Sequence, residues 1–178
     1  MSTAPQPNKP VEAWVANNLF ELGIGPVVVA RHRSGGRTEV GFFLLNVFCL
    51  GIKNAAYSMF DTKAEFEEFL ADFSQNGTLD PHPPACVRKL IEGAAAYAKR
   101  YGFNPHADTR EASRVLGGLD SADCSVTWKF GRDGKPFYVA GPNDTPGKIA
   151  SIIKTLKLTA GEGNFDFLVP GSAADFVS

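Results

Sequence analysis

The longest run of apolar residues extends from Val40 to Ile52, and it is hydrophobic on both of its alternating faces. Positions such as Phe42 fall on one face of an extended chain, and positions such as Phe43 fall on the other. A strand that is apolar on both faces is covered on both sides, so the run predicts a long central strand. Gly51 is expected to break or bulge the strand near its end. The run is shorter than the roughly 20 residues that a membrane-spanning helix needs.

Glycine-containing reversals predict two β-hairpins. The β-branched run at 27–31 leads through Ser34-Gly35-Gly36 into the central strand, and glycine readily adopts the positive φ that tight turns need. Predicted strands at 126–130 and 136–140 flank Asp133-Gly134, a pair typical of hairpin turns.

Apolar residues spaced by three and four positions predict amphipathic helices. The expected helices cover residues 11–22, 62–74, 84–101, 108–117 and 146–158, whereas residues 53–60 fit either a short helix or a loop. Thr62 with Glu65 has the spacing of a capping box, and so does Asp108 with Glu111. Gly102 is placed to end the third helix in a left-handed conformation.

These elements predict an α+β fold: one domain with a mixed or antiparallel sheet and two hairpins, packed against about four or five helices. The chain length suits a single hydrophobic core. Residues 1–10 are polar and proline-rich, and we expect a flexible leader there before a globular domain at 11–158. Residues 159–178 are expected to form a tail or docking segment, with an edge strand at 165–169.

Composition and charge limit the expected cellular location and the classes of binding partner. Hydrophobic residues make up 44% and charged residues 21% of the chain, a balance typical of globular proteins. The net charge of -1 supplies no overall attraction for nucleic acid or for an anionic membrane, so such binding requires a local patch. We expect no membrane association. The polar N-terminus shows no secretory signal, which favours a cytoplasmic location.

The three cysteines, Cys49, Cys86 and Cys124, are far apart and form no C-x-x-C pair. Such spacing is a poor basis for a disulfide framework or a zinc site, so all three are interpreted as structural thiols in a reducing compartment. His82 lies four residues before Cys86, but two intervening prolines favour a loop position for it. We therefore expect neither a metal nor a cofactor.

Basic residues cluster in three places: around the first hairpin, on the long helix and in the second hairpin. In that order they are Arg31, Arg33 and Arg37; Arg88, Lys89, Lys99 and Arg100; and Arg132 and Lys135. Either of the first two sets could neutralise phosphates if the fold brought it to one face, although a solvated surface explains them as well.

Three functional hypotheses follow. The first is a non-catalytic binding module that recognises a protein or nucleic-acid partner through the first hairpin and the basic helix, since no compact set of nucleophile and base emerges. The second is a small metal-assisted hydrolase or nuclease whose carboxylates converge only in the fold. Its candidate residues are Asp108, Asp120, Asp123, Asp133 and Asp144. The third is a structural subunit that self-associates through residues 165–169.

Residues 141–148 stand where a phosphate-binding loop would, after a predicted strand and before a predicted helix. A Walker A loop needs four residues between its glycines and a Ser or Thr after its lysine. Here five residues separate the glycines, and isoleucine follows Lys148. The segment is therefore interpreted as an ordinary connection in which Asn143, Asp144 or Thr145 caps the helix.

Asn46 is a polar residue inside the central apolar run. A buried amide needs hydrogen-bond partners or a cavity beside it. In a fold of the ribonuclease H type, a central-strand carboxylate would bind magnesium, and an amide in its place binds the ion poorly. The favoured interpretation is a satisfied amide at a sheet register or bulge, and a neighbouring site stays open as the alternative.

Three short stretches carry a resemblance: Cys49–Ala55, which reads CLGIKNA; Tyr97–His106, with its Gly-Phe and Pro-His pairs; and Phe130–Pro136, which reads FGRDGKP. Together they are similar to an uncharacterised bacterial protein family whose domain sometimes lies beside a small Cys-rich SEC-C zinc motif. The resemblance runs from Val11 to about Leu156 and implies no activity. This chain lacks the Cys-rich motif, and it has Asn46 and Asn54 where acidic residues are expected in relatives, which speaks against a metal role there.

Overall fold

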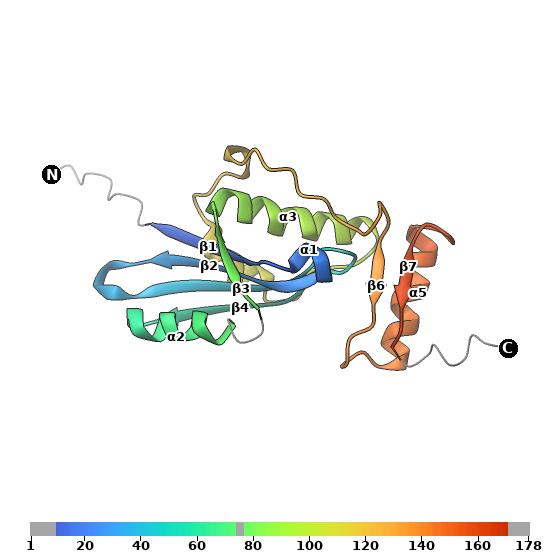
Figure 1. The fold of residues 1–178 in the computed structure, drawn as a ribbon, viewed down its shortest axis with the longest axis horizontal. Helices are drawn as coiled ribbons and strands as arrows, with labels where there is room; N and C mark the ends of the chain where they lie inside the picture. Colours follow the sequence, from blue (N-terminus) through green and yellow to red (C-terminus); the bar gives the residue numbers. More distant parts are fainter. Residues whose placement is uncertain (1–9, 74–76, 171–178) are drawn as a thin grey trace.

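The computed structural model describes residues 10–73 and 77–170. Its main feature is a five-stranded antiparallel sheet with the strand order β4-β3-β2-β1-β5. The strands are β1 (Val11–Ala16), β2 (Ile24–His32), β3 (Thr38–Asn46), β4 (Gly51–Phe60) and β5 (Leu79–His82). The sheet and its helices form one α+β domain, as predicted (Figure 1). The leader expected at 1–10 lies outside the described residues, apart from Pro10.

Helices cover both faces of the sheet (Figure 1). The three longer helices are α2 (Lys63–Phe73), α3 (Pro84–Arg100) and α5 (Pro146–Thr159). Beneath α3, the main core includes Phe43 of β3 and Leu90 of α3. Beneath α2, a smaller cluster includes Val28 of β2 and Phe66 of α2. Because successive residues of a strand point to opposite faces, β2 and β3 are apolar on both sides.

The predicted single strand from Val40 to Ile52 is two strands joined by a tight turn. β3 ends at Asn46, residues 47–50 form the turn, and Gly51 begins β4 with a φ of 71°. Because this φ favours glycine, Gly51 marks a reversal of the chain. The central position of β3 is confirmed, since it lies between β2 and β4.

The turn is apolar because it is buried between the sheet and a second, smaller layer. That layer, which we call the C-terminal layer, consists of α5 and the two short strands β6 (Phe137–Val139) and β7 (Asp166–Leu168). Cys49 and Leu50 of the turn share a core cluster with Tyr138 of β6 and Leu156 of α5. A turn is normally exposed and polar, so its hydrophobic sequence resembled an unbroken strand.

The prediction of an N-terminal helix at 11–22 is wrong. Residues 11–16 form β1, and only α1 (Leu19–Leu22) is helical. The apolar spacing suited a helix, but Ala13 and Val15 also lie on one face of a strand, and both are buried. Pairing with β2 and β5 on its two edges stabilises the extended form. Residues 53–60 are neither helix nor loop, because they belong to β4.

The capping patterns of the helices are largely confirmed. Thr62 Oγ1 accepts from the Glu65 amide at 3.2 Å, and Glu65 accepts from the Thr62 amide at 3.1 Å, so the two form a reciprocal box before α2. Gly102 follows α3 with a φ of 92° and ends the helix as expected. The helix predicted at 108–117 is a short α4 (Thr109–Ala112) followed by a 3-10 turn, and the Asp108 side chain does not cap it.

The prediction of a second hairpin at 126–140 is also wrong. A single bridge joins Arg132 to Lys135, and β6 pairs in parallel with β7 instead of with residues 126–130. Those residues lie along α3: Trp128 Nε1 donates to the Cys86 carbonyl at 3.0 Å, and Phe130 packs against Gly93. Contacts with a helix distant in sequence therefore replace the local pairing.

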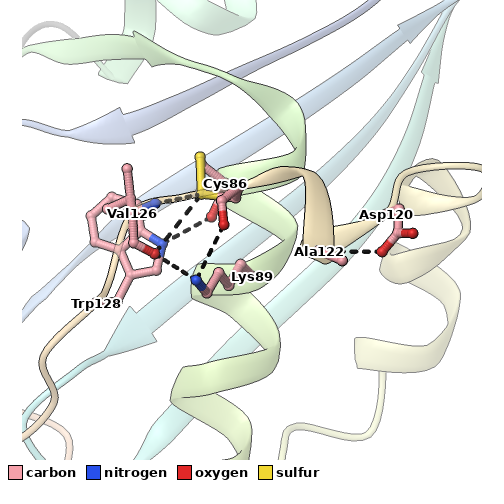
Figure 2. Close-up of a disulfide and its surroundings, with 7 residues drawn as sticks. Cys86, Lys89, Asp120, Ala122, Val126 and Trp128 are labelled. Atoms are coloured by element: carbon pink, nitrogen blue, oxygen red, sulfur yellow. Dashed lines mark hydrogen bonds between the residues drawn. A yellow bond between two sulfur atoms is a disulfide. The ribbon is translucent and has the colours of Figure 1, made fainter.

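Cys86 and Cys124 form a disulfide, which corrects the interpretation of all three cysteines as unpaired thiols. The two residues are 38 positions apart, and their linear spacing gives no sign of the pairing. Figure 2 shows Lys89, Val126 and Trp128 gathered around the bond. The disulfide fastens the segment after α4 to the first turns of α3. Cys49 is a buried free thiol, and burial raises its pKa to about 12.

Candidate functional site

The basic residues of the first hairpin are engaged with groups of the same chain. Arg31 donates to the Val115 carbonyl at 3.0 Å and also to the Gly117 carbonyl. Arg33 pairs with Glu39, and Arg37 lies 3.5 Å from Asp61.

Two basic residues of α3 are also committed within the fold. Arg88 donates to the carbonyls of Leu116 and Leu119 at 3.1 and 2.6 Å. Lys89 donates to the Cys124 and Val126 carbonyls at 3.3 and 2.6 Å, beside the disulfide (Figure 2). These bonds hold loop segments against the helix.

The remaining predicted residues are scattered. Lys99 and Arg100 are exposed at the end of α3, where the Arg100 guanidinium lies over the Tyr101 ring at 5.6 Å. Arg132 lies over the Phe137 ring at 4.7 Å, and Lys135 donates to the Gly163 carbonyl at 3.1 Å. Arg31, Arg88, Lys89 and Lys135 therefore act as internal ties through their bonds to carbonyls.

A cavity of about 520 Å³ lies beside the first hairpin, between the sheet and α2. Three of its cations are Arg33, Arg37 and Lys63, and each of them has an acidic neighbour within 4 Å. His32 bonds to Thr38 Oγ1 at 3.1 Å and to Glu12 at 2.5 Å. This set resembles a catalytic triad in composition only, because Thr38 borders the cavity with only 2% of its surface exposed.

Two further cavities, of about 630 and 370 Å³, meet where the sheet adjoins the C-terminal layer. Both are bordered by the same three residues: Lys53 of β4, His106 of the α3–α4 connection and Lys148 of α5. We call the two cavities together the groove. Figure 1 shows β6, β7 and α5 beyond the end of the sheet, where this junction lies.

Lys53 occupies a β-bulge. Leu44 is opposite Asn54 and Leu45 is opposite Ile52, so Lys53 has no partner on β3. Bulges redirect side chains and are frequent beside functional sites. Lys53 is half-buried, and no hydrogen bond or ion pair holds its ammonium within the part of the chain that the structure describes. Its charge acts on the nearby Asp144 carboxylate without a direct bond, so its N–H groups are available to a ligand.

His106 reaches the groove from the outer edge of β4. Its amide donates to the Ile52 carbonyl at 3.0 Å, which continues the pairing of the sheet edge. The Asp108 amide donates to His106 Nδ1 at 3.2 Å, so in the neutral ring the proton resides on Nε2. Among residues 10–73 and 77–170, no acceptor engages that Nε2, which leaves it as a donor for a ligand.

Asp144 supplies the negative charge at this junction. Its side chain is 3% exposed and accepts hydrogen bonds from Tyr138 Oη at 2.7 Å, the Gly141 amide at 2.9 Å and Lys148 Nζ at 2.8 Å. Burial alone would raise the pKa of Asp144, but these three bonds and the nearby charge of Lys53 hold it well below its usual range. Asp144 is therefore a firmly ionised, internally satisfied carboxylate.

The 141–148 segment is an ordinary connection, as the sequence indicated. Thr145 Oγ1 accepts from the Lys148 amide at 3.2 Å and caps α5. The backbone amide of Gly141 already binds the Asp144 carboxylate. An internal anion thus uses a donor that a phosphate-binding loop would offer to phosphate.

The charges of the groove do not cancel. Lys53 and Lys148 are positive, Asp144 is negative and His106 Nε2 adds a hydrogen-bond donor. One positive charge therefore remains, and it belongs to the lysine without a bonded acid. Carboxylates and phosphates are the groups that such donors bind most strongly in proteins.

Asn46 also borders the larger cavity, but its oxygen serves the fold. Asn46 Oδ1 accepts from the amides of Cys49 and Leu50 at 2.9 and 3.1 Å, which holds the turn between β3 and β4. This arrangement matches the favoured interpretation of a satisfied amide beside an irregularity of the sheet.

The groove could not be recognised as a site from the sequence. His106 ends one stretch of the resemblance and Lys148 ends the 141–148 segment, and no local pattern connects either of them with Lys53. The three residues come from separate segments that only the fold brings together. A lysine immediately after the apolar run was the one local signal, and its bulge depends on pairing with β3.

Two of the carboxylates of the hydrolase hypothesis bind groups of the same chain. Asp120 caps the amide of Ala122 at 2.9 Å, and Asp144 is saturated as described above. Within residues 10–73 and 77–170 there is no group of three or more His, Cys, Asp or Glu side chains that could hold a metal ion. In the same part of the chain, no helix is long and apolar enough to cross a membrane.

Comparisons with protein-family models, with curated proteins and with solved structures find no match for this chain. The resemblance to a family that accompanies SEC-C motifs stays a prediction. The function is therefore inferred from the geometry of the groove.

Proposed function

We propose that the protein is a non-catalytic binding module that holds an anionic group of its partner in the groove. Lys53 is the observation that carries this proposal. The ammonium of this half-buried lysine has no bonded acid in the described chain and can bind an anion that enters, and the bulge places Lys53 at the border of both cavities.

The side chains around Lys53 are suited to holding an anion and poorly suited to catalysis. Asp144 is kept ionised by three donors, so it is a weak general base. Burial and the bond to Asp144 raise the pKa of Tyr138, which keeps the phenol protonated. His106 and Lys148 add donors on either side of the incoming group.

The test is a titration followed by 1H–15N NMR, with glutarate and inorganic phosphate as probes. We expect saturable shifts confined to amides near Lys53, His106 and Lys148. Lys53→Met should weaken binding about tenfold or more, because it removes the unpaired charge and keeps the length of the side chain.

Lys154→Met is the matched control. Lys154 lies on α5 like Lys148, but it is exposed and outside both cavities. The control should bind like the wild type. Shifts that never saturate, or that persist unchanged in Lys53→Met, would show that the groove is not an anion site.

A further inference from the structure

We infer that the occupant of the groove is an extended peptide segment of a protein partner, with an acidic side chain in its interior rather than at an end. This inference rests on the proposed function, since it concerns the same three residues. It adds the chemical class of the partner and the position of the anion within it.

The position of the three shared donors indicates an internal anion. Lys53, His106 and Lys148 border both cavities, so an anion held by them has open space on two sides. A small free anion would leave both cavities empty. A ligand that ends at its anionic group would fill one cavity only. An extended chain that continues in both directions fills both.

The linings of the two cavities differ in chemistry. The larger one is bordered by apolar side chains from four segments: Leu22, Leu44, Phe48, Phe137 and Val139. Leu22 is 56% exposed, so its side chain is accessible to an apolar residue of a partner. This cavity suits apolar residues of the partner.

The smaller cavity has a more evenly mixed lining. Asn104, Ser151 and Thr155 border it with amide and hydroxyl groups, beside the apolar side chains of Leu50, Ile52, Phe103 and Ile152. It suits small polar residues such as serine or glycine. The expected segment is therefore apolar, then acidic, then small and polar, in one of the two chain directions.

The charge of the groove favours a peptide over a nucleic acid. A nucleic-acid strand carries a phosphate at every nucleotide and needs several cations along its path. The groove has one positive charge in excess, and the ionised Asp144 carboxylate lies beside it. Beyond Lys53, His106 and Lys148, neither cavity is bordered by a further basic residue that could hold a second phosphate. A single acidic residue between uncharged ones matches this distribution.

The experiment uses displayed libraries of random heptapeptides with a fixed central Glu or a fixed central Gln, selected on the full-length protein. We expect the Glu library to be enriched at least about tenfold over the Gln library. Selected peptides should carry apolar residues on one side and Ser, Thr, Gly or Asn on the other. Selection on Lys53→Met should abolish the preference for Glu, and selection on Lys154→Met should preserve it.

Variants in each cavity test the two flanks separately. Leu22→Ala removes an exposed side chain of the larger cavity, and Ser151→Trp fills the smaller cavity from an exposed position on α5. Each should weaken a selected peptide at least about fivefold, whereas the control Lys154→Met should not. Thermal melting shows whether each variant is folded.

Three results would overturn the inference. Equal enrichment of the Glu and Gln libraries would remove the acidic anchor. Glutarate binding as tight as that of the selected peptides would remove the extended occupant. An octathymidylate that binds more tightly and displaces the peptides would identify a nucleic-acid strand instead. Absence of any localised shift with glutarate and phosphate would defeat the proposed function itself.

Discussion

At the scale of single residues, Asn46 and Asp144 show how polar side chains maintain the walls of the groove. Asn46 Oδ1 accepts two backbone amides of the turn that separates β3 from β4. Asp144 accepts three hydrogen bonds within the connection that leads into α5. Both residues border the larger cavity, yet their bonds are internal. Lys53 differs from them because its ammonium has no such bond in the described chain.

Replacing Asn46 by Leu should destabilise the protein. The amides of Cys49 and Leu50 would lose their acceptor while remaining buried, and each unsatisfied group costs about 1–3 kcal/mol. We therefore expect the free energy of unfolding, measured with urea, to fall by about 2–4 kcal/mol. Asn46→Asp keeps an oxygen acceptor and should lose less. Equal stability of Asn46→Leu and wild type would show that the two hydrogen bonds contribute nothing.

Asp144→Asn should destabilise the protein in a manner that depends on pH. The folded state lowers the pKa of Asp144, so the ionised carboxylate stabilises the fold above the unfolded pKa of about 3.9. That contribution is lost as pH falls below this value toward the folded pKa. At pH 7 the variant should lose about 2–3 kcal/mol, because bonds to a charged group become bonds to a neutral one.

Thermal melts of wild type and Asp144→Asn at pH 7 and pH 3 provide the measurement. The difference in Tm between the two proteins should be smaller at pH 3. A difference that is the same at both pH values would contradict the lowered pKa. Comparing the two proteins at each pH removes the effect of other carboxylates, which titrate in both.

At the scale of elements, distant contacts decide the structure of two segments. The 126–130 segment has strand-forming residues, but Trp128 bonds to α3 and Lys89 binds the Val126 carbonyl. The N-terminal segment has helical spacing, but pairing with β2 and β5 makes it a strand. In both cases the partner is far away in the sequence, so local pattern alone favours the wrong element.

The disulfide should stabilise the segment that it fastens to α3. We expect the double variant Cys86→Ser with Cys124→Ser to lose about 2–4 kcal/mol of unfolding free energy, because the unfolded chain is no longer cross-linked. Hydrogen exchange should accelerate at amides 120–130 more than in β3. Tris(2-carboxyethyl)phosphine should destabilise the wild type similarly and leave the double variant unchanged. If the wild type, denatured without a reducing agent, shows three reactive thiols, the disulfide does not form.

At the scale of the whole molecule, the groove exists because the C-terminal layer lies against the end of the sheet. Its three hydrogen-bond donors come from β4, from the α3–α4 connection and from α5. The buried turn at 47–50 contributes Cys49 and Leu50 to the core of that layer, so the same contacts that hide the turn also position the groove.

The sequence by itself determined the α+β class, the central place of β3 and the three longer helices with most of their caps. These features depend on periodicity and on neighbours within a few residues, which are visible along the chain. The tertiary structure alone decided the reversal at 47–50, the strand character of the N-terminus, the Cys86–Cys124 bond and the meeting of Lys53, His106 and Lys148. Each of these depends on which distant segments pack together, because burial and pairing across the fold outweigh local preference.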